Sequence, residues 1–367
     1  MVVSRTDWDV IIIGGGPAGS TTARYAAQNG ADVLVIDERE VIGSPLQCGE
    51  LVPSNSELKR LCPRVPDIDD LFRTPERAVS RRTNRLRLVP PSRKGLEYAF
   101  EGVILNRPVH DQALVALAET CSVRYLTGTR VDRVEGSTVK CRDDSEFHAK
   151  VIVGSGGTSD PLRRQFWTEE SLNIPVKFIL IDGEFDDLVE LHFGSTAPGG
   201  YAWIIPKANG ANIGVGIQRR FAGSRSLNEF AAEFFAGHRG EVTFRGAGAL
   251  PMSGTIKSFV KGNHLLVGDS AGMVLPSNGA GITIAMIGGR IAGQVIARHI
   301  RDGTSLKQYE SIWKQQMGRQ MRNSKRSMRL AGLMFRSPDL IVNMMFNRLL
   351  KPFIWRAVTG RARLGIL

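Results

Sequence analysis

Apolar positions near both ends of the first 300 residues form short continuous runs, each followed by a glycine-rich turn and a helical pattern. Residues 9–30, "DVIIIGGGPAGSTTARYAAQNG", contain an apolar run, a glycine turn and a helix, and residues 31–39, "ADVLVIDER", add a second apolar run. Residues 262–297, "GNHLLVGDSAGMVLPSNGAGITIAMIGGRIAGQVIA", repeat the order of strand, loop and helix. Short apolar runs bounded by glycine are typical of strands covered on both faces. The pattern therefore predicts an α/β lobe assembled from separate parts of the chain.

The middle of the chain shows a different pattern, in which apolar and polar residues alternate. Residues 77–100 predict strands that leave the α/β lobe, and residues 178–216 predict further strands that turn at "PGG" and at "NGAN". Such alternation between glycine or asparagine turns is typical of half-buried strands. A helix is predicted over residues 226–238, and the α/β pattern resumes at about Gly254. We expect a second, sheet-built lobe inserted between the pieces of the first.

Length and cysteine content narrow the class of protein. A chain of 367 residues is long for a single core, and 42% hydrophobic residues fit a folded protein with two lobes. The cysteines Cys48, Cys62, Cys121 and Cys141 contain no CxxC pair, so we expect reduced thiols, with neither a disulfide framework nor a metal site. The N-terminus enters a strand without a basic leader, and no apolar run reaches the length of a membrane span. The expected location is the cytoplasm.

Positive charge is concentrated in the last part of the chain. Residues 301–367 hold fourteen lysines and arginines and three acidic residues, which is +11 of the net charge of +12. On a helix over residues 313–330, four arginines lie on one arc and three methionines on the opposite one: Arg319, Arg322, Arg326 and Arg329 against Met317, Met321 and Met328. Such an element either lies on an anionic membrane surface or packs on the second lobe with a solvated basic face, and both can hold together. No recognised nucleic-acid-binding fold accompanies the charge, so no nucleic acid partner is expected.

The first glycine turn carries a dinucleotide-binding fingerprint. Gly14, Gly16 and Gly19 stand in GxGxxG register after a predicted strand and before a predicted helix, and Asp37 ends the second strand. Glycines at these positions allow the tight turn, the approach of the backbone to a pyrophosphate and close packing of the helix, whose N-terminus faces the phosphates. Asp37 can accept hydrogen bonds from ribose hydroxyls. The fingerprint alone does not choose between NAD and FAD.

Two further segments resemble the para-hydroxybenzoate hydroxylase-like FAD flavoproteins. Residues 262–297 are similar to the second FAD motif of that group, in which Asp269 would hold a ribityl or ribose hydroxyl and the helix that starts near Gly281 would face the reduced flavin. The small residues of this helix, Gly288, Gly289, Ala292 and Gly293, would let it lie tightly against the sheet. In "ILNRPVHDQALVALAE", Arg107 stands where that group reaches the flavin side of the cofactor. The resemblance implies an α/β protein with a Rossmann-type (GR2-like), discontinuous FAD-binding domain. The cofactor contacts it implies are Gly14, Gly16, Ala18, Gly19, Asp37, Cys48, Gly49, Leu51, Arg107, Val131, Asp269, Gly281 and Ile282.

One element of that group is altered. In "AKVIVGSGGTSDPLRR", residues 149–164, Ser155 occupies the place of an expected aspartate. That segment helps to position NADPH in the hydroxylases, and the chain has no second GxGxxG unit after a strand. The resemblance therefore leaves NAD(P)H and a ferredoxin as alternative external electron donors, the latter implying an electron-donor protein as a partner.

Two short elements are similar to those of the geranylgeranyl reductases, which saturate isoprenoid double bonds. "PLQC", residues 45–48, matches their PxxC element in the loop after the second strand. "YAWIIPKANGANIGVG", residues 201–216, matches YxWxFP followed after seven residues by GxG, with Ile205 where phenylalanine is usual. The matching positions of the second element are Tyr201, Trp203, Pro206, Gly214 and Gly216. They are the expected substrate residues, with the aromatic ones walling an apolar tunnel and the glycines letting a strand pass close to the flavin ring.

The second resemblance implies FAD-dependent saturation of geranylgeranyl chains, most plainly those of digeranylgeranylglycerophospholipids, by hydride transfer from the reduced flavin. Cys48 is the candidate catalytic residue, as a proton donor or as a side chain that shapes the face of the ring. A lipid substrate would place the protein peripherally on the membrane. The alternatives are an aromatic monooxygenase of the hydroxylase type and a flavin-binding membrane protein without turnover.

The expected division of the chain follows from these assignments. The FAD-binding domain is expected to comprise residues 1–74, 103–165 and 254–303. The substrate domain is expected to comprise residues 75–102 and 166–253, and a basic helical segment residues 304–367.

Overall fold

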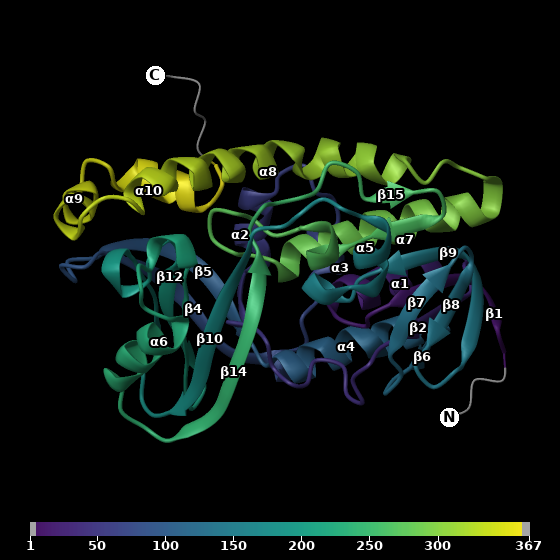
Figure 1. Ribbon diagram of the computed structural model, residues 1–367, viewed down its shortest axis with the longest axis horizontal. Coiled ribbons are helices and arrows are strands. Elements are labelled where there is room, and N and C mark those ends of the chain that lie inside the picture. Colours follow the sequence, from purple (N-terminus) through teal and green to yellow (C-terminus); the bar gives the residue numbers. More distant parts are fainter. Residues whose placement is uncertain (1–4, 362–367) are drawn as a thin grey trace.

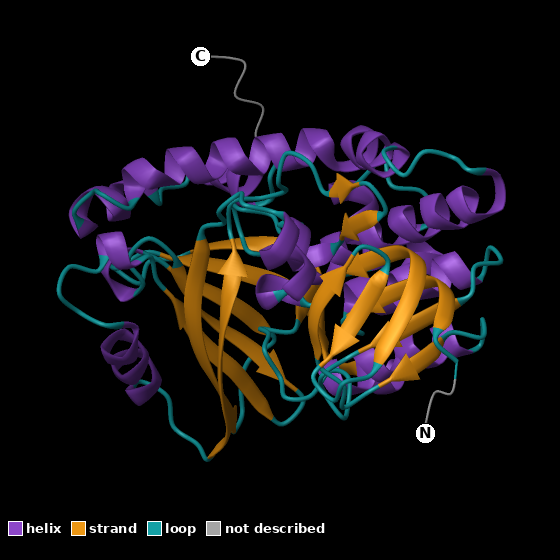
Figure 2. Ribbon diagram, turned by 45° about the vertical axis from the view of Figure 1, so that its right-hand side comes forward, coloured by secondary structure: helices purple, strands orange, loops and turns teal. Residues whose placement is uncertain are grey.

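Two sheets lie side by side, and a long C-terminal helix crosses above both (Figures 1 and 2). The computed structural model describes residues 5–361 of the 367. Each sheet has eight strands. The expected α/β fold, with a nucleotide-binding type of lobe, a sheet-built lobe and C-terminal helices, is confirmed.

The first sheet is parallel along most of its width because its strands are connected through helices. Its order is β15-β16-β9-β1-β2-β6, and the hairpin of β7 and β8 attaches to β9. Its strands are β1 (Asp7–Ile13), β2 (Val33–Ile36), β6 (Arg124–Leu126), β7 (Val131–Glu135), β8 (Thr138–Cys141), β9 (Glu146–Gly154), β15 (Val260–Lys261) and β16 (His264–Leu266). β1 pairs in parallel with β2 and β9, placing the carboxyl ends of these strands together. The continuous apolar runs are fully buried, as their pattern predicts: Val10, Ile11 and Ile12 have no exposed surface.

Helices cover this sheet. α1 (Pro17–Ala27) contacts both α4 (Arg107–Glu119) and α7 (Ile282–Asp302). A β-carbon at Gly293 would lie 2.5 Å from the Thr22 carbonyl oxygen, and one at Gly289 would lie 2.6 Å from the Ala18 carbonyl oxygen. The small residues of α7 therefore permit close packing against helix α1, whereas the sequence led us to expect packing against the sheet.

Three short helices complete this lobe. They are α2 (Asn55–Leu61), α3 (Ile68–Leu71) and α5 (Pro161–Phe166). The buried Asp160 precedes α5 as its N-cap, and its carboxylate accepts a hydrogen bond from the Arg163 backbone N–H at 2.9 Å. This is the capping geometry that aspartate favours at a helix start.

The second sheet is antiparallel except where β4 meets β11. Its order is β14-β10-β13-β12-β11-β4-β5-β3. Its strands are β3 (Leu51–Pro53), β4 (Val79–Val89), β5 (Leu96–Leu105), β10 (Asn173–Asp182), β11 (Leu188–His192), β12 (Tyr201–Lys207), β13 (Gly210–Gly216) and β14 (Val242–Pro251). α6 (Leu227–Ala236) packs on β10 and β13, and a reciprocal capping box between Ser226 and Glu229 starts it.

We propose the division into lobes that the sequence predicts, with one adjustment suggested by the pairing of β3 with β5. β3 and the end of β5 lie in stretches expected to belong to the FAD-binding domain, yet both pair within the second sheet. The loop that contains Cys48 leads directly into β3. Residues 51–53 thus tie the cysteine loop to the substrate lobe.

The C-terminal segment forms α8 (Gln308–Met334), α9 (Asp339–Met345) and α10 (Lys351–Val358). α8 extends the predicted helix at both ends; its arginines 319, 322, 326 and 329 are exposed, whereas Met317 and Met321 are buried. Trp355 stacks on Tyr98 of the second sheet, with 4.6 Å between ring centroids. The packing interpretation of the tail is therefore correct. Within residues 5–361, no helix combines the length and the hydrophobicity needed to cross a membrane.

Candidate active site

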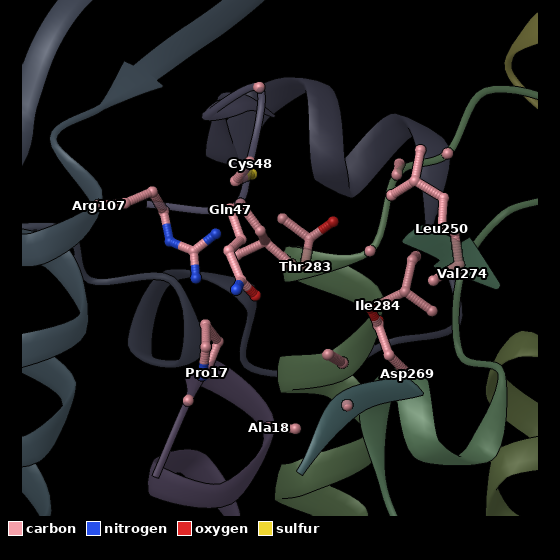
Figure 3. A pocket seen from close by; sticks show the side chains of 18 of the residues that line it. Pro17, Ala18, Gln47, Cys48, Arg107, Leu250, Asp269, Val274, Thr283 and Ile284 are labelled. Atoms are coloured by element: carbon pink, nitrogen blue, oxygen red, sulfur yellow. The ribbon is translucent and has the colours of Figure 1, made fainter. Parts of the chain in front are cut away.

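A single cavity of about 670 Å³ joins the two lobes. Its lining begins at the first glycine turn and Asp37, passes Cys48 and Asp269, and ends at the aromatic side chains of the second sheet and of α10. Figure 3 shows Cys48, Gln47 and Arg107 on one side of this space and Thr283, Ile284 and Asp269 on the other. The structure thus brings the two FAD motifs and the cysteine loop into one site.

The nucleotide end follows the geometry that the fingerprint predicts. Gly14 has φ of +99°, and a β-carbon there would lie 2.7 Å from the Ser155 carbonyl oxygen, so only glycine fits the turn. At Gly19 a β-carbon would lie 1.9 Å from the Gly14 carbonyl oxygen. A β-carbon on Gly16 would meet only Arg39 Nη2, at 3.9 Å, and Gly16 lines the cavity. The turn is thereby packed on its inner side and free on the side that faces a ligand.

Asp37 already has protein partners. Its buried carboxylate accepts a hydrogen bond from the Gly15 N–H at 2.6 Å, and the Arg39 guanidinium donates to both of its oxygens. The hydrogen bond to Asp37 raises the pKa of Arg39. Arg39, Thr129, Arg130 and the predicted Val131 line the cavity here. Arg39 was not among the predicted site residues, although it stands two positions after the acid that ends β2.

The second motif supplies an unpartnered carboxylate beside a helix start. The Asp269 side chain has no hydrogen-bond partner among the described residues, and burial raises its pKa to about 6. A β-carbon on Gly281 would lie 3.4 Å from Asp269 Oδ1. α7 begins at Ile282 without a side-chain cap, so its first N–H groups lack side-chain acceptors. Gly281 and Ile282 line the same cavity.

Arg107 reaches the cavity from the start of α4 and is held by an acid on the same helix. Its guanidinium donates to both oxygens of Asp111, at 3.0 and 2.8 Å. Burial acts to raise the pKa of Asp111, but the charge of Arg107 and the hydrogen bonds from His110 and Arg107 together outweigh it and lower that pKa to about 2. His110 Nδ1 lies 3.1 Å from the same carboxylate. Asp111 and His110 were not predicted; their i,i+4 and i,i+3 spacing from Arg107 is the available signal.

The cysteine loop is anchored by three polar residues that the sequence did not single out, the buried Glu50 and Asn212 and the partly exposed Lys207. The Cys48 carbonyl accepts from Asn212 Nδ2 at 2.8 Å, and the Cys48 sulfur accepts from the Glu50 N–H at 3.1 Å. Glu50 forms an ion pair with Lys207, 2.7 Å from Nζ to Oε2, and accepts from Asn212 Nδ2 at 3.2 Å. Asn212 and Lys207 belong to the hairpin of β12 and β13, so the second lobe positions the loop. The anchoring follows from contacts between segments over 150 residues apart.

Burial raises the pKa of the Cys48 thiol, against the lowering effect of the nearby Arg107 charge. An exposed thiol has a pKa of about 8.5, so a raised value keeps Cys48 protonated at neutral pH. The group is therefore a neutral S–H donor rather than a thiolate nucleophile. It lines the cavity between Arg107 and the aromatic wall.

The aromatic motif divides into residues that face the cavity and residues that support them. Tyr201 and Trp203 line it; the Tyr201 hydroxyl donates to the Asn278 carbonyl at 2.7 Å, and Trp203 Nε1 donates to Asn212 Oδ1 at 2.9 Å. Pro206, Gly214 and Gly216 do not line it. A β-carbon on Gly214 would lie 2.1 Å from the Trp203 ring, so this glycine makes room for the indole rather than for an approach to a flavin.

The altered segment contains an acid five residues further on. The Ser155 hydroxyl donates to the Gly14 carbonyl at 2.7 Å and so braces the glycine turn. Asp160 accepts from the Gly156 N–H at 2.7 Å, and burial raises its pKa to about 6. Ser155 lines the cavity.

The far end of the cavity is an apolar chamber. Besides Tyr201 and Trp203, its walls come from the second sheet and from the C-terminal helices: Leu86, Phe100, Val176, Phe178, Leu191, Ile205, Leu250, Trp355 and Val358. The contribution of the C-terminal helices was not predicted, because no local pattern marks which strand a distant helix will cover.

Comparison with known proteins identifies the family. Residues 172–247 match the geranylgeranyl reductase catalytic domain, and residues 9–161 match an FAD dependent oxidoreductase domain. Digeranylgeranylglycerophospholipid reductase 3 of Methanosphaera stadtmanae is 32% identical over 322 residues, covering 80% of this chain and 78% of that protein. The chain belongs to this reductase family.

Other relatives agree with this assignment. Digeranylgeranylglycerophospholipid reductase 1 of Methanothermobacter thermautotrophicus is 29% identical, covering 87% of this chain and 85% of that protein. A geranylgeranyl bacteriochlorophyll reductase-like protein of Thermoplasma acidophilum has a TM-score of 0.84 at 22% identity, covering 96% of each chain. A flavin-dependent brominase has a TM-score of 0.71 at 18% identity, covering 97% of this chain and 94% of the brominase. At these identities the two structures share the fold.

The predictions of family, FAD and an oxidoreductase activity are confirmed for this reductase. The aromatic monooxygenase alternative has less support, because the second lobe matches the geranylgeranyl reductase catalytic domain. The site also fits FAD on its own geometry. Two helix starts without side-chain caps, at Gly16 and Gly281, and the unpartnered Asp269 all line one cavity. Helix starts bind negative charge, and a lone carboxylate accepts hydroxyl donors.

Proposed function

We propose that this reductase saturates the double bonds of geranylgeranyl chains carried by digeranylgeranylglycerophospholipids, as in archaeal membrane lipid biosynthesis. One observation carries the proposal: a single cavity runs from the dinucleotide turn, past Cys48, into an apolar chamber. A chamber whose walls are aliphatic and aromatic suits a long hydrocarbon and offers few hydrogen bonds to a polar aromatic substrate. The names of the relatives specify the same class of lipid.

FAD supplies the hydride when it is bound and reduced. The protein must supply or relay the matching proton and exclude water from the alkene. We propose Cys48 for this place, as the proton donor or as the side chain that shapes the reacting face, because its thiol is protonated and borders the chamber. Tyr201 and Trp203 are proposed as the wall along which the prenyl chain lies. Their polar atoms are bonded to Asn278 and Asn212, which leaves their ring faces for an apolar ligand.

We further infer that the reductase contacts the cytoplasmic side of a membrane as a peripheral protein. Its proposed substrate is a membrane lipid, and the C-terminal segment carries most of the net positive charge. Anionic lipid surfaces attract such segments.

An anaerobic half-reaction tests the proposed function. The FAD-loaded protein is reduced with dithionite, digeranylgeranylglyceryl phosphate is added, and flavin absorbance and lipid mass are followed together. We expect flavin reoxidation in step with a gain of two hydrogens per double bond. A flavin that stays reduced until air is admitted, with oxygen uptake on addition of an aromatic substrate, would contradict the proposal and favour a monooxygenase.

A further inference from the structure

Exposed apolar side chains gather on one part of the molecule, the end of α8 together with α9 and α10. Of eleven large apolar side chains exposed among the described residues, nine lie between residues 330 and 353. We call this group the apolar platform and define it by six of its members, Leu333, Leu340, Met344, Leu349, Leu350 and Phe353. Leu349 is 92% exposed and Leu340 is 70% exposed. Single exposed leucines are ordinary on a protein surface, but a gathered group indicates a binding surface.

Packing of these helices on the second lobe does not account for the platform. α9 buries Val342 on its inner side, and Phe346 just beyond it is also buried. α10 buries part of Trp355 against Tyr98. The inner faces thus hold the helices in place, and the platform is the remaining outer face. Its exposure has no counterpart elsewhere in the described residues, where Val41 and Leu172 are the other two exposed members of the eleven.

Exposed arginines flank and interrupt the platform residues along the chain. Arg329, Arg336, Arg348 and Arg356 are exposed, and none of them forms an ion pair within residues 5–361. The single acid between residues 329 and 356 is Asp339, whose carboxylate is occupied by the backbone N–H and hydroxyl of Ser195. Apolar side chains interspersed with unpaired arginines are complementary to a surface with an anionic outer layer and a hydrocarbon interior.

The platform is continuous with the active-site cavity through α10. Phe353 belongs to the platform, whereas Trp355 and Val358 of the same helix line the apolar chamber. Thr359, at the end of α10, and Gln320 of α8 also line that cavity. One short helix therefore has a solvent-facing apolar side and a side that faces the chamber.

We propose that the apolar platform docks on an anionic lipid surface, which places α10 and the adjoining end of the cavity at the membrane. The proposal rests on the proposed function for the nature of the substrate, and it adds the surface through which this chain meets its lipid. Leu340, Leu349 and Phe353 enter the hydrocarbon boundary while the four arginines meet headgroup phosphates. A prenyl chain can then pass from the lipid layer along α10 into the chamber without crossing water.

Vesicle sedimentation tests this proposal with the full FAD-loaded chain. The probes are vesicles of phosphatidylcholine alone and vesicles that also contain phosphatidylglycerol. We expect binding to the anionic vesicles, weakened by salt. Leu349→Asp is expected to reduce binding about tenfold or more, because an apolar side chain is lost from the interface and an anion is added. Val41→Asp, which makes the same change of charge at a distant exposed site, is the matched control and should bind as the unaltered chain does.

A second measurement separates failure of docking from failure of the proposed function. The Leu349→Asp variant is expected to catalyse prenyl reduction of detergent-dispersed substrate at the normal rate. With substrate carried in vesicles, its rate is expected to fall by the same factor as its vesicle binding. Failure of the unaltered chain to bind anionic vesicles, or equal binding by Leu349→Asp, overturns the docking surface. A dimer in solution that Leu349→Asp dissociates, without vesicle binding, also overturns it and assigns the platform to a second copy. Loss of prenyl reduction in the unaltered chain in detergent overturns the proposed function instead.

Discussion

Asn212 offers the sharpest test of how the second lobe positions the cysteine loop. Its side chain is fully buried and engages three groups: Oδ1 accepts from Trp203 Nε1 at 2.9 Å, and Nδ2 donates to the Cys48 carbonyl at 2.8 Å and to Glu50 Oε2 at 3.2 Å. Asn212→Ala removes all three hydrogen bonds at once. The indole N–H and the Cys48 carbonyl are then left without their hydrogen-bond partner in a largely water-excluded place.

The size of the effect follows from these contacts. Each buried polar group left unpaired costs about 1–3 kcal/mol, so two neutral groups predict a loss of roughly 2–6 kcal/mol in the free energy of unfolding. Trp203→Phe alone removes the indole N–H and leaves Asn212 Oδ1 unpaired. In the double variant neither member of that pair remains, so its loss is smaller than the sum of the single losses by about 1–3 kcal/mol.

Urea unfolding of the cofactor-free protein, followed by far-ultraviolet circular dichroism, measures the four corners of this cycle. The exposed Asn209→Ala, in the same hairpin, is the control and should change stability by no more than about 0.5 kcal/mol. Flavin reoxidation by the prenyl substrate should also slow in Asn212→Ala while FAD remains bound, since the Cys48 loop loses its anchor. Single-variant losses that simply add, together with an unchanged reoxidation rate, would refute the reasoning.

Three further predictions concern other parts of the molecule. Cys48→Ala should retain FAD and lose most turnover; an unchanged rate of flavin reoxidation removes Cys48 from the mechanism. In the cofactor-free protein, burial raises the pKa of both Asp269 and Asp160 to about 6. Their contribution to the free energy of unfolding is therefore largest below pH ~4, near the pKa of an exposed aspartate, and is lost as the pH rises from there through about 6. Asp269→Asn should flatten part of that fall in urea midpoints measured across this range, and an identical profile contradicts the assignment. Gly293→Ala should destabilise by about 1–3 kcal/mol through its clash with α1, whereas Gly332→Ala, with open space around it, should stabilise by up to about 1 kcal/mol; equal thermal shifts would argue against helix contact as the cause.

Much of the first lobe could be predicted because its signals are local. The turn at Gly14 and the acid at Asp37 lie within one strand–turn–helix–strand unit, where the chain itself dictates the spacing. The helix after Gly281 was likewise readable from its apolar run. The element against which α7 packs could not be predicted, because small residues indicate a close contact but do not identify the element that makes it. The structure shows that this element is α1.

The active site was predictable in its motifs and not in its supports. Cys48, Tyr201 and Trp203 could be singled out because short motifs mark them. Glu50 and Lys207 belong to no such motif. A lone acid and a lone lysine are expected to be surface charges, and only the fold brings Lys207 Nζ to 2.7 Å from Glu50 Oε2. Pairing of that kind depends on the docking of two lobes, which no local pattern encodes.

The sequence by itself determined the nucleotide turn, the order of strands and helices, and the concentration of basic residues in residues 301–367, because each depends on neighbours in the chain. Only the tertiary structure decided that the C-terminal helices bury one face on the second sheet and leave the other uncovered. It also decided that α10 forms part of the chamber wall through Trp355. The physical reason is that burial of an amphipathic helix depends on the surface it meets, and that surface is formed by strands more than 100 residues away in the chain.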